Sequence, residues 1–198
     1  KEKEINSVKV DESPLSVGFF FVVSGSMSFT ERNTKINRVD WGRQAILDFL
    51  RTIKGDNEYF ISTFSEPIIH LSDFVNKNET IQILTKNENF SPPKARQTAF
   101  YDSVIAGIEK LSKGKNERKV LFILSDGYDN ISASNFKKLH KLARENILTV
   151  FVLSIYDPNG NNLFMYDSQE KMNKLTKDSG GKAFVLFDLK NTIGYMLS

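Results

Sequence analysis

Short, continuous apolar segments that alternate with amphipathic segments constrain the fold of this 198-residue chain more than any other feature. Three of the apolar segments are residues 17–23 (VGFFFVV), 119–124 (KVLFIL) and 148–155 (LTVFVLSI). They show no regular alternation of polar and apolar residues, so they predict strands that are buried on both faces. Strands of this kind belong to mostly parallel sheets that carry helices on each side.

The remaining pattern completes an α/β order of elements. Helices are predicted where apolar residues recur with helical spacing, over residues 39–53, 79–84, 99–111, 136–145 and 170–178 and in the tail after 189. Further strands are predicted at 58–64, 68–74 and 183–187, and the brief connection between the first two suggests a hairpin with one antiparallel edge strand. Because crossovers between parallel strands are right-handed, the sequence predicts a doubly wound, mostly parallel sheet of the Rossmann-like type, with helices on both faces.

Length and composition fit one large domain and exclude several kinds of site. Residues 1–14 are interpreted as an N-terminal lead-in, and residues 15–198 as one domain. The chain has no cysteine, which excludes disulfides and zinc–thiolate sites. Its net charge of +3 is spread along the sequence, so no nucleic-acid partner is expected. No apolar stretch approaches the roughly 20 residues of a membrane span, so no insertion is expected, and no signal peptide is visible in this sequence.

Hydroxyl and carboxylate side chains gather in the loops that follow the predicted strands. Ser24 and Ser26 follow the first strand, and Asp126 follows the strand at 119–124. Thr98 stands at the entry to a helix that reaches the same edge. In a doubly wound sheet, ligands bind at the carboxyl ends of the strands where the strand order reverses. The sequence therefore predicts an oxygen-rich cluster at this edge, of the kind that Mg²⁺ prefers.

Three segments resemble the metal-site segments of von Willebrand factor A-type domains, and they occur in the family's order. Residues 19–27 (FFFVVSGSM) resemble the first, usually Asp-x-Ser-x-Ser after an apolar strand, residues 98–102 (TAFYD) the second, and residues 124–127 (LSDG) the third. The resemblance covers nearly the whole domain and implies a metal-ion-dependent adhesion site at the top of the sheet. The residues that match the family's metal ligands are Ser24, Ser26, Thr98 and Asp126.

One position departs from the family's pattern. Two residues before Ser24 the family has Asp, and here stands Val22. Asp126 is then the only carboxylate among the matched ligands, and one carboxylate with hydroxyls binds Mg²⁺ poorly. Val22 also fits its strand as one more β-branched core residue. The resemblance therefore implies a degenerate site in which Mg²⁺, Mn²⁺ or Ca²⁺ is held weakly or not at all.

The loops around the cluster are expected to form a contact rim, made of residues 24–30, 91–102 and 126–131. Asp102 either orients the loop hydroxyls by hydrogen bonding or is an ordinary acidic residue in the first turn of a helix. Asp129 and its neighbour Asn130 are either turn formers or ligand contacts. Four further side chains are each either an apolar anchor for a partner or packing within the loops: Met27, Phe29, Phe90 and Tyr128.

The resemblance implies a protein-binding module for adhesion or scaffolding, outside the cell or in its envelope, without catalysis. If a cation is held, an acidic side chain of the protein partner would complete its shell. One alternative is a metal-assisted hydrolase that uses Asp126, with Asp102 or Asp129 as the base. Another is a purely structural domain of a larger envelope protein. Nucleophile-elbow, phosphate-loop and dinucleotide-loop motifs do not occur. Neither the oligomeric state nor the partner's identity follows from the sequence.

Overall fold

The computed structural model describes residues 13–23, 27, 37–64, 68–86, 90, 98–125, 127–155 and 162–186. The elements, in chain order, are β1 (Leu15–Val22), α1 (Arg38–Thr52), β2 (Glu58–Phe64), β3 (Ile68–His70), α2 (Lys77–Thr85), α3 (Phe100–Leu111), β4 (Arg118–Ser125), α4 (Phe136–Glu145), β5 (Thr149–Ile155), α5 (Asn162–Asp178) and β6 (Ala183–Leu186).

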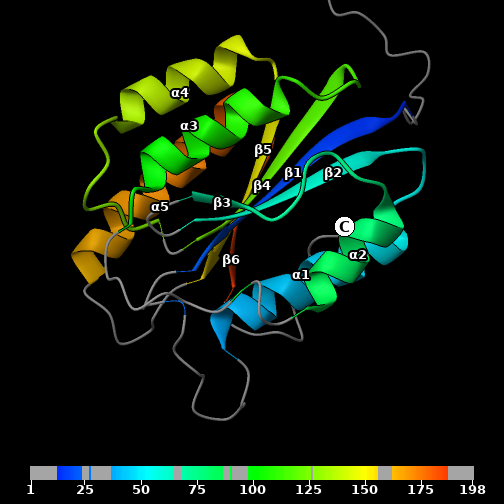
Figure 1. Cartoon of the computed structure of the whole chain (residues 1–198). Helices are drawn as coiled ribbons and strands as arrows, with labels where there is room; N and C mark the ends of the chain where they lie inside the picture. Colours follow the sequence, from blue (N-terminus) through cyan, green and yellow to red (C-terminus); the bar gives the residue numbers. More distant parts are fainter. Residues whose placement is uncertain are drawn as a thin grey trace, which may run out of the picture.

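Within the described residues, the strands form one six-stranded sheet in the order β3-β2-β1-β4-β5-β6 (Figure 1). The pairs β2–β1, β1–β4, β4–β5 and β5–β6 are parallel, and β3 alone runs antiparallel, beside β2. The predicted mostly parallel sheet with one antiparallel edge strand is therefore confirmed. The order along the sheet reverses between β1 and β4, so the carboxyl ends of these two strands form the switch point where doubly wound sheets bind ligands.

Helices cover both faces of the sheet. Figure 1 shows α3, α4 and α5 on one face and α1 and α2 on the other. Because alternate side chains of a strand point to opposite faces, Phe19 of β1 meets Phe49 of α1, whereas Phe20 lies against Gly107 of α3. A Cβ atom at Gly107 would lie 2.6 Å from the ring of Phe20, so this glycine lets α3 approach the sheet closely. By the same alternation, Val22 faces α3.

Four aromatic rings form a row across four neighbouring strands on the α1 face. The centroid of Phe19 lies 6.1 Å from that of Tyr59 in β2 and 5.5 Å from that of Phe122 in β4. Phe122 in turn stacks on Phe151 of β5 at 5.2 Å. Cross-strand aromatic pairs of this kind each stabilise a sheet by roughly 0.2–1 kcal/mol. The row thus ties the central strands together below α1.

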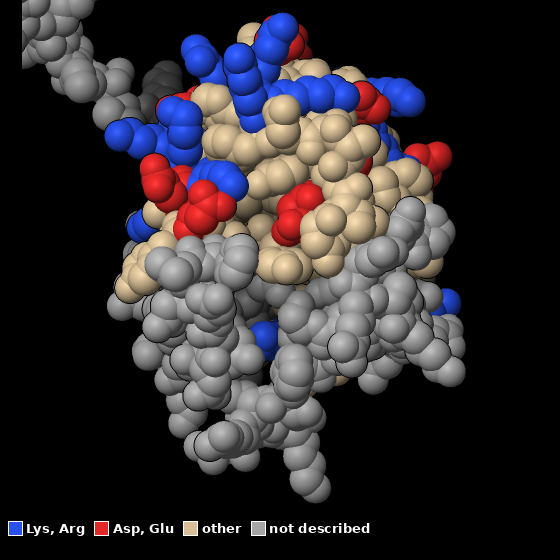
Figure 2. All heavy atoms as spheres, turned by 90° about the vertical axis from the view of Figure 1, so that its left-hand side faces the viewer, with Lys and Arg blue, Asp and Glu red and all other residues tan. Residues whose placement is uncertain are grey.

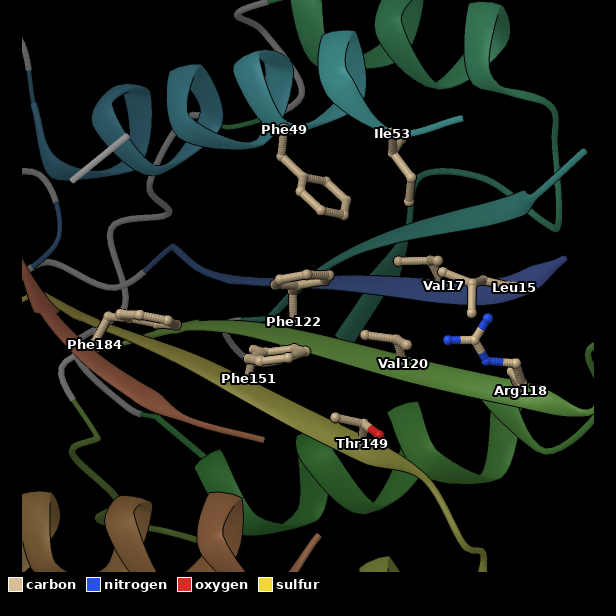
Figure 3. Close-up of a pocket in the computed structure, with 10 residues that line it drawn as sticks. All are labelled: Leu15, Val17, Phe49, Ile53, Arg118, Val120, Phe122, Thr149, Phe151 and Phe184. Atoms are coloured by element: carbon tan, nitrogen blue, oxygen red, sulfur yellow. The ribbon is translucent and has the colours of Figure 1, made fainter. Parts of the chain in front are cut away.

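A groove of about 310 Å³ opens beside α1 on this face (Figure 3). The stacked rings of Phe122 and Phe151 form part of its wall. The groove extends to Leu15, Arg118 and Thr149, which are the first residues of their strands. It therefore lies toward the amino ends of the strands, away from the carboxyl edge that holds the predicted site.

The edge strand β3 is shorter than predicted. Regular pairing is interrupted after His70 because the amides of Leu71 and Ser72 both donate to the carbonyl oxygen of Ile61, at 3.0 and 3.3 Å. Two residues opposite one make a β-bulge, which bends the strand away from its partner. The chain then pairs with β2 again at a single bridge between Val75 and Tyr59. The predicted strand over residues 68–74 was right in type and position but extended four residues too far.

Helix α5 begins at Asn162, eight residues before the predicted start at residue 170. Side chains one turn apart stabilise its early part, because Lys171 pairs with Asp167 and Gln169 donates to Asn173 at 2.8 Å. The helix predicted after residue 189 lies outside the described residues. None of the described helices has the length and apolar character needed to cross a membrane.

Candidate functional site at the carboxyl edge of the sheet

The predicted site falls partly within the described residues. Ser24, Ser26 and Asp126 lie outside them. Val22 and Thr98 are described, and both are buried, with exposed fractions of 0% and 3%. The ends of β1 and β4 lie side by side at this edge, with Phe21 opposite Leu124.

Val22 is the last residue of β1 and lies opposite Phe64 of β2. Its side chain is part of the apolar core, and it supplies no oxygen at the position where the resemblance implies a carboxylate. An ionised Asp at this depth would lose its hydration, which is costly unless a cation or several hydrogen-bond donors replace the water. The residue therefore contributes to the core and not to a cation site.

Helix α3 begins without a capping side chain of its own. Its N-cap residue, Ala99, makes no side-chain hydrogen bond. In contrast, α1, α2 and α4 each have an Asn as the N-cap, and its side chain accepts a hydrogen bond from a main-chain amide of the first turn. The first amides of a helix have no partner inside it and must be satisfied from outside. Here the carboxylate of Asp129 accepts from the amide of Tyr101 at 3.1 Å, and the hydroxyl of Ser132 accepts from the amide of Asp102 at 3.2 Å. The loop between β4 and α4 thus caps α3.

Four further hydrogen bonds hold this loop against the start of α3. The amide of Thr98 donates to Oδ1 of Asn130 at 2.8 Å, and the amide of Asn130 donates back to the carbonyl oxygen of Thr98 at 3.1 Å. The carboxylate of Asp102 accepts from the amides of Ala133 and Ser134, at 2.7 and 3.0 Å. The second predicted segment is therefore held against the loop that follows the third.

Residues 98–102 and 127–135 form one hydrogen-bonded unit at this edge, which includes described residues of the predicted rim, and we refer to this unit as the rim clamp. The amide of Ser132 donates to Asp129 at 3.2 Å, which closes the loop on itself. On its other side, Gly127 has φ +75° and accepts a hydrogen bond from the hydroxyl of Ser168 in α5 at 3.2 Å. The rim clamp is thus held by both α3 and α5.

The carboxylates of the two acidic residues in the rim clamp, Asp102 and Asp129, accept hydrogen bonds from main-chain amides. The hydroxyl of Ser134 lowers the pKa of Asp102, assisted by the amides of Ala133 and Ser134 and by the charge of Lys138, while partial burial acts in the opposite direction. Asp102 is therefore ionised at neutral pH. Asp129 accepts from two amides in the same way. Across the described ranges, no three carboxylate or imidazole side chains lie together as a metal site would require.

The apolar side chains predicted for the rim differ in exposure. Met27 and Phe90 are only 1% and 3% exposed, and the ring of Phe90 packs edge-on against Phe21 with centroids 5.0 Å apart. They are therefore packing within the loops, whereas Tyr128 is 46% exposed. Phe29 lies outside the described residues. Of the three that are described, Tyr128 is the exposed one.

Sequence reasoning missed the part that Ser132 plays, and it left Asn130 as a turn former or ligand contact. No signal in the sequence pointed to either role, because the helix predicted over residues 99–111 follows Thr98, a residue type that can itself cap a helix. The structure starts the helix one residue later, with Ala99 as the N-cap, and this shift leaves the first amides to be capped by another segment.

Comparison of the sequence with models of protein families and with curated proteins gives no match, whereas solved structures do match. A protein described as von Willebrand factor type A from Catenulispora acidiphila has a TM-score of 0.69 at 12% identity, over 92% of this chain and 41% of that chain. The PilB minor pilin from Streptococcus sanguinis has a TM-score of 0.68 at 16% identity, over 96% of this chain and 61% of the pilin chain. An aerotolerance-related membrane protein from Bacteroides fragilis has a TM-score of 0.66 at 13% identity, over 92% of this chain and 96% of that chain. This chain has the von Willebrand factor type A fold.

The von Willebrand factor type A (vWA) fold confirms the architecture implied by three short segments of sequence. At 12–16% identity the likeness concerns the fold alone. In this chain, Val22, Thr98 and the rim clamp occupy the carboxyl edge at the β1–β4 switch point. The chain spans less than two thirds of the pilin and of the Catenulispora protein, and nearly all of the Bacteroides chain.

Proposed function

We propose that this chain is a vWA protein-binding module, used for adhesion or scaffolding, which contacts its partner at the carboxyl edge of the sheet without a metal ion. The observation that carries the proposal is the burial of Val22. A fully buried apolar side chain stands at the position where the resemblance implies a metal-site carboxylate, while hydrogen bonds hold the surrounding loops in place.

Charge and hydration favour binding without a metal. The residues that would hold a cation are Ser24, Ser26, Thr98 and Asp126, and only one of them is a carboxylate. Mg²⁺ gives up its water reluctantly and needs more negative charge than one carboxylate supplies. Asp102 and Asp129 are the nearby acids in the sequence, and both hold amides of the rim clamp. The partner would then be bound by hydrogen bonds and by the exposed ring of Tyr128, a residue type enriched at interfaces.

We assign no catalytic activity to this edge. A metal-assisted hydrolase would need a second group to activate water, and the two candidates, Asp102 and Asp129, already serve as acceptors for main-chain amides. A location on the cell surface or in the envelope is part of the proposal. It is supported by two structural neighbours, which are named as a minor pilin and a membrane protein.

Calorimetric titration with Mg²⁺ and Mn²⁺ tests the absence of a metal. The wild-type chain should give no binding heat at about 1 mM cation, since its matched ligands include a single carboxylate. Val22→Asp should bind the cation, and the cation should raise its Tm. The control is Val23→Asp, which places the same carboxylate one residue later, just past the end of β1. Wild-type binding that matches Val22→Asp would contradict the proposal, whether or not the variant folds without metal.

Partner capture tests the use of the rim. The immobilised chain should retain the same proteins from a cell-envelope extract in EDTA as in Mg²⁺. Tyr128→Glu should abolish capture, because it replaces the exposed rim ring with a charge. Tyr166→Glu is the matched control, since Tyr166 of α5 is also exposed, at 71%. Equal capture by both variants would show that the rim is not the contact surface.

A further inference from the structure

The edge of the sheet opposite the candidate site carries a concentration of positive charge. Residues 112–119, 141–147 and 177–182 precede β4, β5 and β6, so they lie at the amino ends of these strands. Together they contain eight Lys and Arg and three Asp and Glu, a net charge of +5, whereas the whole chain carries +3. Figure 2 shows basic side chains gathered at the top of this face, with a few acidic side chains among them. The charge is therefore localised and not spread evenly over the fold.

Strand pairing and hydrogen bonds hold these three segments next to one another. β4 and β5 pair from Val120 opposite Thr149 onward, which places residues 112–119 beside residues 141–147. The amide of Val150 donates to the hydroxyl of Ser179 at 3.0 Å, and the amide of Val152 donates to the carbonyl oxygen of Lys182 at 3.1 Å. The basic residues thus share one surface.

Several of the cations on this surface are exposed, while two of its three anions have cationic partners. Asp178 lies 3.8 Å from the ammonium group of Lys174, and Glu145 pairs with Lys141 at 3.7 Å. These contacts weaken the negative field at the edge. The exposed basic residues of the three segments are Lys113, Lys115, Arg118, Lys141, Arg144, Lys177 and Lys182.

An exposed apolar side chain projects from the middle of this charge. Ile147 lies in the turn between α4 and β5 and is 90% exposed. Its φ is +47°, in the left-handed region that β-branched residues rarely adopt. Asn or Gly would fit this backbone with less strain. Strain of this kind points to a role beyond folding when it coincides with a surface feature.

We propose that this surface docks on a bilayer that contains anionic phospholipids. We call it the basic edge and define it as Lys113, Lys115, Arg144, Ile147, Lys177 and Lys182. Basic side chains are attracted to anionic headgroups, and an apolar side chain among them enters the boundary between headgroups and acyl chains. An acidic protein would explain the charges but would give no reason for a strained, exposed isoleucine among them.

Docking at the basic edge would orient the molecule. The basic edge and the rim clamp lie at opposite ends of the strands, so a chain that sits on a membrane through one presents the other to the medium. The inference adds a second surface to the proposed function and does not depend on it, because docking involves no residue of the rim.

Co-sedimentation with vesicles tests the proposal. The chain should bind phosphatidylcholine vesicles that contain about 30% phosphatidylglycerol and should not bind pure phosphatidylcholine, and added salt should weaken binding. Lys113→Gln/Lys177→Gln should lower the partition coefficient about thirtyfold, since each cation near an anionic surface contributes roughly fivefold. Ile147→Asn keeps the charge and fits the left-handed backbone, so it should fold at least as well and bind about fivefold more weakly.

The matched control is Lys86→Gln/Lys137→Gln, which removes the same charge from exposed positions at the other ends of α2 and α4. It should reduce binding far less than the double variant of the basic edge. Equal losses would mean that only net charge matters and would overturn the proposal. Equal binding to both kinds of vesicle would also overturn the proposal. Binding to soluble polyglutamate without binding to either kind of vesicle would overturn it as well. The capture assay with Tyr128→Glu reports on the rim independently, so either idea can fail alone.

Discussion

Removing one carboxylate from the rim clamp should loosen it by a predictable amount. Asp102→Asn retains the shape of the side chain but removes its charge and one of its two acceptor oxygens. It weakens the bonds from the amides of Ala133 and Ser134, at 2.7 and 3.0 Å. Hydrogen bonds to a charged group contribute roughly 1.5–3 kcal/mol, and solvent screening of this half-buried group reduces the loss to about 1–2 kcal/mol. For a domain of this size, that corresponds to a fall in Tm of roughly 2–8 °C.

The pH dependence separates this effect from a general packing defect. The pKa of Asp102 is lower in the folded chain than in the unfolded chain, because hydrogen bonds to Ser134 and its neighbours favour the charged form. The stability it contributes is therefore fully present above the unfolded pKa of about 3.9 and is lost as pH falls through the folded value. Urea unfolding of wild type and Asp102→Asn should differ at pH 7 and converge toward pH 3.

The control is Asp167→Asn, which removes an exposed acid that pairs with Lys171 along α5. Its unfolding curve should match that of the wild type, because exposed pairs contribute little. A difference between wild type and Asp102→Asn that stays constant down to pH 3 would refute the reasoning. It would show that the carboxylate's charge does not hold the loop.

Two further predictions concern other parts of the fold. Gly181→Ala should cost about 3 kcal/mol or more in chemical unfolding, because its Cβ would lie 1.9 Å from the carbonyl oxygen of Val150. Gly180→Ala should cost only about 1 kcal/mol, from its φ of +77° in open space; a larger cost for Gly180→Ala would contradict this ranking. Burial, followed by the charge of Lys110, lowers the pKa of His70, so wild-type stability should decrease as pH falls below about 6.5. His70→Gln should remove that part of the decrease in thermal unfolding between pH 7.5 and 5, and an unchanged slope would show that His70 is not responsible.

The sequence predicted best the elements that have both an apolar pattern and clear ends. The strand over residues 58–64 and the helix over residues 136–145 match to the residue. The strand is an apolar run after a Gly-Asp-Asn break, and the helix follows Asn135, whose side chain accepts from the amide of Lys138. Burial and capping are local causes, so they leave a local trace in the sequence.

The errors arose where a contact distant in sequence set the boundary. The bulge that ends β3 depends on the carbonyl oxygen of Ile61, which lies ten residues before Leu71. The apolar periodicity of the sequence gives no sign of this contact. The predicted start of α5 was wrong for a different reason. Turn signals at residues 157–160 and a polar stretch at 166–169 hid a helix whose early part is supported by polar side-chain pairs.

The candidate site could be predicted in place but not in detail. The resemblance placed Thr98 and the loop after β4 at one edge, and the structure joins them through Asn130. It could not show that Asp102 and Asp129 hold amides, because those partners lie about 30 residues away and depend on the final packing of α3 against β4. The roles of Ser24, Ser26 and Asp126 stay predictions.

The bulge after β3 also affects how copies of this domain behave toward one another. An exposed sheet edge is a template on which another chain can add a strand, and long, flat, apolar edges promote aggregation. Here the edge strand has three residues before the bulge interrupts it, and the segment that follows rejoins β2 at a single bridge, Val75 with Tyr59, even though Ile69 is 51% exposed. The sheet therefore offers a poor template at this side, and many copies could be crowded together on one surface without joining edge to edge.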